Sequence, residues 1–191
     1  MATKDDARAG RKTWRKSLPR EVVTQWSGDI QRHFLQTLAY RHTTRLALYA
    51  PSDNEVLTDG IFEAARRDGK HVCYPRIPST GRVLSFVDVA QRDDLHPGRF
   101  GLLEPSPSAA SVSLEDIDTF VVPCLGVTLG GHRLGRGGGY YDATLCKARA
   151  GATFVAFAYC GQVLQSIPTT NMDVRMHVVV TEQGVVVGES A

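Results

Sequence analysis

A series of short apolar runs, separated by turn residues, constrains the fold of this chain more than any other feature of the sequence. Runs of this length that are rich in β-branched and aromatic residues predict strands. Helical segments are expected near residues 55–68 and 141–150, with Gly69 and Gly151 as helix stops. Strands that alternate with helices predict an α/β sheet with helices on both faces. The expected strands are residues 46–50, 71–74, 83–89, 119–124, 153–159 and 177–181.

Prolines stand at the ends of several of these runs, at Pro51, Pro75 and Pro123. Irregular loops are therefore expected to follow these strands at one edge of the sheet. Ligands of open α/β sheets bind outside the carboxyl ends of the strands. The sequence thus predicts a binding site at this edge. Residues 103–113, which are rich in proline and serine, predict a long surface loop.

Two helices are expected before the first strand. Pro19 suits the first turn of the second helix, and apolar residues then recur at helical spacing along its buried side at Val23, Trp26, Ile30, Phe34 and Leu38. Over residues 4–17, cationic side chains recur at helical spacing and predict a helix with one cationic face. By itself such a stripe is typical of a solvated face. Its members are Lys4, Arg8, Arg11 and Arg15.

The chain of 191 residues is long enough for one sizeable core, and we expect residues 1–191 to form a single domain that works as a monomer. A net charge of +2 predicts neither a nucleic-acid surface nor a membrane surface, so any preference for anions must be local. No apolar run approaches the length of a membrane span. The cysteines are far apart and form no CxxC pair, and the histidines lack the spacing of metal ligands. Reduced thiols fit the cytoplasm.

Glycine is concentrated between the strand at 119–124 and the helix expected near residue 141. Seven of the fourteen residues from 126 to 139 are glycine, where average usage would give about one. Backbone N–H groups of such a loop can face one anion together with the start of the following helix. Arg133 and Arg136 add charge that suits phosphate oxygens, and Asp142 is placed to hold a magnesium ion that bridges phosphates.

Other interpretations of this segment stay open at this point. GxxxxGK[ST] is absent, and GxGxxG fails because Tyr140 stands where the third glycine should be. The segment is also compatible with a flexible hairpin in which Asp142 only caps a helix. "GRGGGYY" at residues 135–141 is compatible with an RNA contact in which arginine and tyrosine stack on bases.

Residues 121–145, "VVPCLGVTLGGHRLGRGGGYYDATL", resemble the signature of the 5-formyltetrahydrofolate cyclo-ligase family. The match is most specific from Gly131 to Asp142. Weaker similarity runs along the chain at residues 4–8, 49–58, 69–77, 101–105 and 167–184. The resemblance implies a three-layer α/β/α fold of the NagB/RpiA/CoA-transferase-like kind with a mostly parallel sheet. It also implies ring closure of 5-formyltetrahydrofolate to 5,10-methenyltetrahydrofolate, in which ATP phosphorylates the formyl oxygen.

The resemblance further implies roles for individual residues. ATP is expected to contact Lys4, Arg8, Arg133, Leu134, Gly135, Arg136, Gly137, Gly138, Gly139, Tyr140 and Tyr141. Magnesium is expected at Asp142 and Asp173, and folate at Ala50, Glu55, Arg136 and Tyr140. Arg133, Arg136 and Tyr140 are the expected catalytic residues.

Two of these assignments have competing interpretations. "SDNE" at residues 52–55 has the form of a capping box that would open the next helix, so Glu55 is also explained by helix capping. Tyr140 is a candidate for stacking on the flat folate ring; Phe86 is a second candidate, for which a place in the core is the favoured explanation.

The sequence departs from the family pattern at several positions. Val127 and Thr128 stand where Phe and Asp are frequent, Gly138 replaces a frequent lysine, and Met172 replaces a frequent histidine. The Val127-Thr128 departure leaves open whether the folate pocket differs from that of the family. These departures keep two alternatives open: a non-catalytic nucleotide- or RNA-binding protein, and a phosphosugar isomerase on the same fold.

Overall fold

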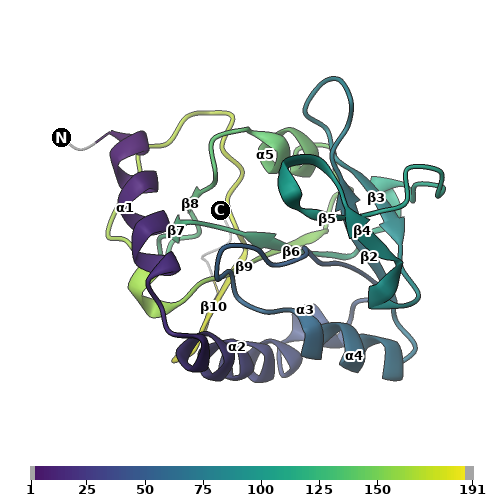
Figure 1. The fold of residues 1–191 in the computed structure, drawn as a ribbon, viewed down its shortest axis with the longest axis horizontal. Coiled ribbons are helices and arrows are strands. Elements are labelled where there is room, and N and C mark those ends of the chain that lie inside the picture. Colours follow the sequence, from purple (N-terminus) through teal and green to yellow (C-terminus); the bar gives the residue numbers. More distant parts are fainter. Residues whose placement is uncertain (1–2, 188–191) are drawn as a thin grey trace.

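A seven-stranded sheet runs through the centre of the fold in the computed structural model, which describes residues 3–187 (Figure 1). The strand order is β11-β10-β9-β6-β1-β2-β3. Neighbouring strands are parallel except at the two edges, where β3 and β11 are antiparallel to their neighbours. The strands are β1 (Arg45–Ala47), β2 (His71–Arg76), β3 (Ser85–Asp88), β6 (Thr119–Pro123), β9 (Thr153–Phe157), β10 (Val178–Thr181) and β11 (Gly184–Val187).

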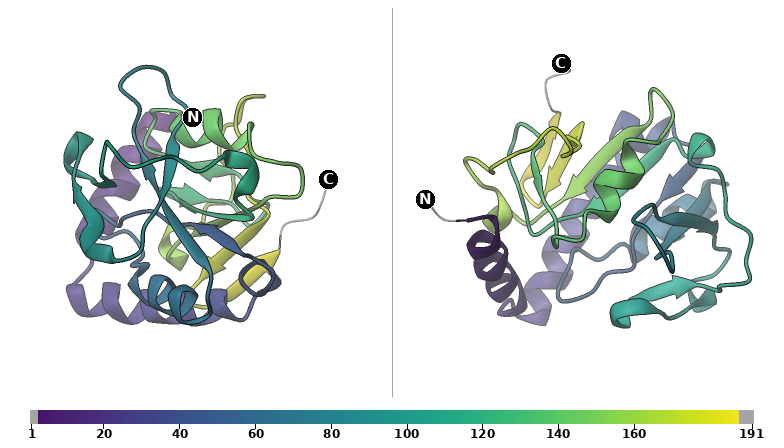
Figure 2. Two further views of the ribbon diagram at one scale, coloured as in Figure 1. Left: turned by 90° about the vertical axis from the view of Figure 1, so that its right-hand side faces the viewer. Right: turned by 90° about the horizontal axis from the view of Figure 1, so that it is seen from above.

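Helices cover both faces of this sheet, which gives three layers. Three of them lie on one face, α2 (Arg20–Leu35), α3 (Leu38–Arg41) and α4 (Asp59–Arg67), while α5 (Tyr140–Leu145) lies on the other (Figures 1 and 2). The first helix, α1 (Lys4–Lys16), stands at one side of the fold. This arrangement confirms the expected α/β fold with a mostly parallel sheet. Among residues 3–187, no helix has the length and apolar character needed to cross a membrane.

Smaller elements lie around the sheet. Two hairpins are each formed by a pair of antiparallel strands, β4 (Leu95–Pro97) with β5 (Leu103–Pro105) and β7 (Gly126–Val127) with β8 (Arg133–Leu134). Short 3₁₀ helices are η1 (Arg92–Asp94), η2 (Arg99–Gly101), η3 (Leu114–Asp116) and η4 (Cys160–Gln162).

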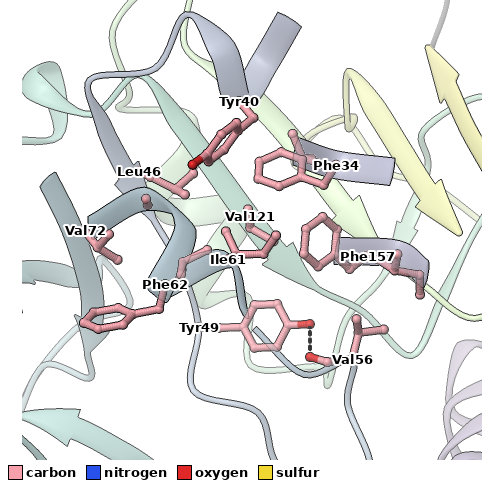
Figure 3. Close-up of a cluster of buried hydrophobic side chains, with 14 of the residues drawn as sticks. Phe34, Tyr40, Leu46, Tyr49, Val56, Ile61, Phe62, Val72, Val121 and Phe157 are labelled. Atoms are coloured by element: carbon pink, nitrogen blue, oxygen red, sulfur yellow. Dashed lines mark hydrogen bonds between the residues drawn. The ribbon is translucent and has the colours of Figure 1, made fainter. Parts of the chain in front are cut away.

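The main core lies between the sheet and the helices α2 and α4 that cover one of its faces (Figure 3). Phe34 of α2 meets Phe157 of β9 edge to face, with ring centroids 5.1 Å apart. The buried Tyr49 hydroxyl donates to the Val56 carbonyl oxygen at 2.9 Å, so its polar end is satisfied inside this core. This bond also fixes both ends of the loop that connects β1 to α4. The loop is therefore anchored in the core, which matters below because it lines the site.

Every expected strand is found in the central sheet, with ends that differ by a few residues. The helices differ more. α4 begins at Asp59 rather than near residue 55, and α5 ends at Leu145 rather than near 150. Gly69 follows α4 with φ +72°, as expected for a helix stop. Gly151 also has a positive φ, but it ends the turns that follow α5 and not the helix itself.

Two further expectations are wrong. Leu38 is 66% exposed and begins α3, because the second helix already ends at Leu35. The stretch 103–113 is not one loop, since its first residues form β5. The remainder is organised by Arg76, whose guanidinium donates to the carbonyl oxygens of Ser106, Pro107 and Ala109.

Candidate active site

A cavity of about 470 Å³ lies at the carboxyl ends of β1, β2 and β6. These strands are neighbours and parallel, so their ends meet at one edge of the sheet. Tyr49 and Ala50, which follow β1, line the cavity together with Pro75 and Pro123. A cavity therefore lies at the sheet edge where the prolines predicted a binding site. A larger groove of about 1140 Å³ lies elsewhere and is lined by none of the expected site residues.

All residues to which the family resemblance gives a nucleotide, folate or metal role line this one cavity. They come from α1, the β1–α4 loop, the segment from β8 into α5, and the segment before β10. The residues are Lys4, Arg8, Ala50, Glu55, residues 133–142 and Asp173.

The glycine-rich loop forms one wall of the cavity. Gly137 and Gly139 have φ of +102° and +70°, a backbone conformation that side chains with a Cβ rarely adopt. Arg8 of α1 donates from Nε to the Gly135 carbonyl oxygen at 3.1 Å, which ties the first helix to the loop. At Gly138, an added Cβ would lie 2.8 Å from the Tyr140 ring. The loop is thus held between α1 and the start of α5.

Arg133 and Asp142 form an ion pair at the base of the loop. Nη2 of Arg133 lies 3.1 and 3.0 Å from the two carboxylate oxygens of Asp142. One of these oxygens also accepts the Val174 N–H at 3.2 Å. Asp142 is the third residue of α5, whose cap is Gly139 without a side-chain hydrogen bond, so Asp142 does not cap this helix. The helix-cap interpretation of Asp142 is therefore wrong.

Asp173 brings a second carboxylate to the cavity. Lys4 donates to it at 3.0 Å, and the Thr170 N–H donates to the same oxygen. Burial raises the pKa of Asp173, but these hydrogen bonds and the Lys4 charge outweigh it and leave the pKa below its ordinary value. Asp173 is next in sequence to Val174, the residue that binds Asp142, so the two carboxylates belong to one region of the wall.

These two carboxylates fit a magnesium ion that completes its shell with water and phosphate oxygens. Within residues 3–187, no group of three or more His, Cys, Asp or Glu side chains is arranged to hold a metal ion. Any ion bound here must therefore take most of its ligands from solvent and from a phosphate-bearing ligand. Magnesium commonly binds in this way.

Glu55 lies at the centre of a charged cluster. Its Oε1 is 2.9 Å from Nη2 of Arg136 and 3.4 Å from Nη1 of Arg15, and its Oε2 accepts the Ser52 N–H at 3.0 Å. The contact between Ser52 and Glu55 closes a turn in which Asp53 has φ +51°. It opens no helix, because α4 starts only at Asp59. The capping-box interpretation is wrong, and Glu55 instead lines the cavity, paired with Arg136 and Arg15.

The cationic face of α1 contacts protein and is not a solvated surface. Lys4 binds Asp173, Arg8 binds the Gly135 carbonyl, and Arg11 donates to the Gly161 carbonyl oxygen at 2.5 Å. Arg15 is 1% exposed and donates to the carbonyl oxygens of Asp53 and Cys124. The sequence pattern placed Arg15 on a solvated face, whereas the structure buries it inside the protein.

Phe86 is core and not a folate contact. It is buried and meets Phe120 edge to face at 5.5 Å, on the sheet face that carries α5. Val127 is fully buried in the same core, and Thr128 lies outside the cavity too. Neither Val127 nor Thr128 therefore lines the cavity.

Among the departures from the family pattern, only Gly138 lines the cavity, and Met172 is 77% exposed outside it. The cavity also has a wall that sequence reasoning missed. It is formed by Ile77 and by Phe100, Leu102, Leu103 and Glu104 on the β4–β5 hairpin. No local motif marks these residues as a site, apart from the weak family similarity at 101–105.

Comparisons with known proteins identify the family to which this chain is similar. Residues 1–182 match the model of the 5-formyltetrahydrofolate cyclo-ligase family. A 5-formyltetrahydrofolate cyclo-ligase of Mycolicibacterium smegmatis is 32% identical over 181 residues, which cover 90% of each chain. That of Haemophilus influenzae is 29% identical over 151 residues, 78% of this chain and 81% of the relative. The solved structure of Aquifex aeolicus 5,10-methenyltetrahydrofolate synthetase superimposes with a TM-score of 0.84 at 29% identity and covers 98% of this chain and 95% of that one.

Proposed function

The chain belongs to the 5-formyltetrahydrofolate cyclo-ligase family, and we propose that the cavity at the carboxyl ends of β1, β2 and β6 is its active site. The enzyme converts 5-formyltetrahydrofolate into 5,10-methenyltetrahydrofolate. One observation carries the assignment of the site: residues from distant segments, each expected to bind nucleotide, folate or metal, line a single cavity. The geometry therefore supports a site in which both substrates meet.

ATP is the proposed second substrate, and it supplies the phosphoryl group that turns the formyl oxygen into a leaving group. Phosphoryl transfer asks the protein for alignment and for positive charge around the phosphate oxygens. Lys4, Arg8, Arg133 and Arg136 line the cavity beside the glycine-rich loop and provide that charge. No nucleophilic side chain is required, because N10 of the substrate attacks the formyl carbon. Arg133, Arg136 and Tyr140 are the side chains that we propose to touch the reacting groups.

Arg136 links the proposed nucleotide and folate sites. Its side chain is 43% exposed and binds Glu55, with Asp53 at 3.5 Å. Phosphate oxygens that compete for this guanidinium would free an oxygen of Glu55 to accept an N–H of the folate. Ala50 lies on the same wall, and Tyr140 presents an aromatic ring to the cavity. We therefore propose that nucleotide binding prepares Glu55 for folate.

Asp142 and Asp173 are the proposed magnesium ligands. Each now faces a cation, Arg133 and Lys4 respectively. Arg133 and Lys4 hold these carboxylates in place when no metal is bound. A magnesium ion bound together with phosphate would share the carboxylates with these two cations. Magnesium would neutralise negative charge on the phosphate oxygens, and the arginines would neutralise more of that charge.

The RNA-binding alternative has no support from this geometry. A strand of RNA needs a cationic surface along which its backbone can lie. Here Arg133 and Arg136 face carboxylates inside a cavity. A cytoplasmic location stays a prediction, based on cysteines that are far apart in the sequence and form no CxxC pair. A monomeric state also stays a prediction.

To test Asp173 as a magnesium ligand, the rate of 5,10-methenyltetrahydrofolate formation is measured against Mg²⁺ concentration in Asp173→Asn and in the unmodified protein. We expect the Mg²⁺ concentration for half-maximal rate to rise at least about tenfold, since even outer-shell partners of a metal ligand contribute 10- to 100-fold to affinity. Asp93→Asn, an exposed carboxylate outside the cavity, is the matched control. The same magnesium dependence in both variants would remove Asp173 from the metal site.

A further inference from the structure

The cavity carries no excess of positive charge, although ATP, its proposed ligand, is strongly anionic. Four cationic and four carboxylate side chains line it. Most of these cations already face a carboxylate of the same cavity: Lys4 faces Asp173, Arg133 faces Asp142, and Arg136 faces Glu55. A phosphate group that approaches such a cation has to compete with the carboxylate for its N–H donors. A nearby cation without a carboxylate partner would therefore strengthen phosphate binding at this site.

Arg82 is such a cation, and it lies against the glycine-rich loop. Its Nη1 is 3.6 Å, and its Cδ 3.9 Å, from the position that a Cβ would take at Gly139. Gly139 lines the cavity and directly precedes α5. The Arg82 side chain is exposed, and neither an ion pair nor a hydrogen bond joins it to another residue of the described range 3–187. An uncommitted guanidinium thus stands beside the wall proposed to bind phosphates.

The main chain next to Arg82 is bonded to the start of α5. Arg82 belongs to the loop between β2 and β3, which lies next to this helix (Figure 1). The Leu84 N–H donates to Oγ1 of Thr144 at 2.9 Å, and this hydroxyl donates to the Tyr140 carbonyl oxygen at 2.6 Å. Leu84 itself lines the cavity. Arg82 is therefore two residues from a fixed point of the cavity wall, so its side chain can reach a ligand there without movement of the main chain.

The chemistry of the guanidinium suits this position. Its fork of N–H donors matches phosphate oxygens and can bind two of them at once. Arg136 has to share its donors with Glu55 when phosphate arrives, whereas Arg82 breaks no ion pair. Exposure alone does not mark a ligand-binding residue, since Arg66 of α4 is also exposed without a carboxylate partner among residues 3–187. Proximity to the glycine-rich loop distinguishes Arg82 from Arg66.

We propose that Arg82 binds the phosphates of ATP from the rim of the cavity beside Gly139. This inference rests on the proposed function, because it adds a cation to the nucleotide site of that function. The β2–β3 loop contributes none of the other cations that line the cavity. Arg82 then supplies the positive charge that the paired cations of the cavity lack.

The test compares equilibrium dissociation constants for ATP in the presence of Mg²⁺ and for 5-formyltetrahydrofolate, each ligand being measured separately. In Arg82→Met the Kd for ATP should rise about tenfold, the lower end of the range for a hydrogen bond to a charged group, because the residue is exposed. The Kd for 5-formyltetrahydrofolate should stay unchanged. Arg66→Met is the matched control outside the cavity. It removes the same charge from an exposed arginine and should change neither constant.

Two further measurements separate a phosphate contact from a change in the packing of the loop. Arg82→Lys keeps the charge without the fork of donors, so its Kd for ATP should fall between those of the unmodified protein and Arg82→Met. The difference in Kd between Arg82→Met and the unmodified protein should shrink as salt is added, because salt screens exposed charges. A difference that salt leaves unchanged, or an Arg82→Lys variant no better than Arg82→Met, would overturn the phosphate contact.

The inference is also overturned by an unchanged Kd for ATP in Arg82→Met, or by an equal rise in Arg66→Met. A rise confined to 5-formyltetrahydrofolate would assign Arg82 to the carboxylates of that ligand and would overturn it too. Each of these results leaves the unmodified protein able to bind ATP. If the unmodified protein bound no ATP, the proposed function on which this inference rests would fail instead.

Discussion

Replacing Arg15 by methionine should destabilise the fold, because Arg15 is the buried cation that joins α1 to the wall of the active site. Its Nε donates to the Asp53 carbonyl oxygen at 2.9 Å, and its Nη1 donates to the Cys124 carbonyl oxygen at 3.1 Å. The same Nη1 lies 3.4 Å from Glu55. Methionine is similar in length and fills much of the same space, but it offers no donor.

The size of the effect follows from these contacts. A hydrogen bond to a charged group contributes about 1.5–3 kcal/mol, so the two bonds to carbonyl oxygens together contribute roughly 3–6 kcal/mol. Glu55 keeps Arg136 as a partner, and the buried methionine recovers part of the loss. We expect a net loss of about 3 kcal/mol in the free energy of unfolding. For a chain of this size, that corresponds to a fall in Tm of roughly 6–12 °C.

Urea unfolding followed by far-ultraviolet circular dichroism measures this free energy. Lys12→Met is the control, since Lys12 is an exposed residue of the same helix and should stay within about 0.5 kcal/mol of the parent. If Arg15→Met also stayed within that range, Arg15 would be a solvated residue and the packing of α1 against the cavity would be wrong.

Three further outcomes follow from single contacts. Gly131→Ala should lower the free energy of unfolding by about 2 kcal/mol or more in urea unfolding, because Gly131 has φ +86° and an added Cβ would overlap a backbone oxygen. Burial lowers the pKa of His177, whose neutral ring accepts the Phe154 N–H, so unfolding free energy should fall as the pH drops below about 6.5. In His177→Asn the unfolding free energy should not fall in this pH range. If the variant and the unmodified protein showed the same pH profile, His177 would not be the group responsible. Lys4→Met should raise the pKa of Asp173 toward its ordinary value in an NMR titration, and an unchanged pKa would exclude the ion pair.

Patterns that involve many residues predicted the architecture well. Alternation of apolar runs and helices gave the sheet, and the prolines at residues 51, 75 and 123 located the edge where the cavity lies. β11 and the β4–β5 hairpin were missed, because strands of three or four residues carry too little pattern to be distinguished from loops. Helix ends were missed for the related reason that local contacts, such as the Ser52–Glu55 turn, decide them.

Side chains whose role depends on tertiary contacts could not be predicted in the same way. Periodicity placed Arg15 and Lys4 on one helix face, but it does not say whether that face meets water or protein. The family resemblance named residues that the fold brings into one cavity, which no local pattern could have shown for Asp173. Glu104 carried no signal beyond the weak family similarity at residues 101–105, since one carboxylate in a short apolar strand becomes unusual only when its burial is known.

We propose that this cavity joins ATP, magnesium and folate in one ring-closing reaction. The most direct test is the formation of 5,10-methenyltetrahydrofolate from 5-formyltetrahydrofolate, followed by absorbance with and without ATP and Mg²⁺. Product that appears only when both are present is the predicted result. Product formed without ATP, or none from folded protein that binds both ligands, would contradict the account.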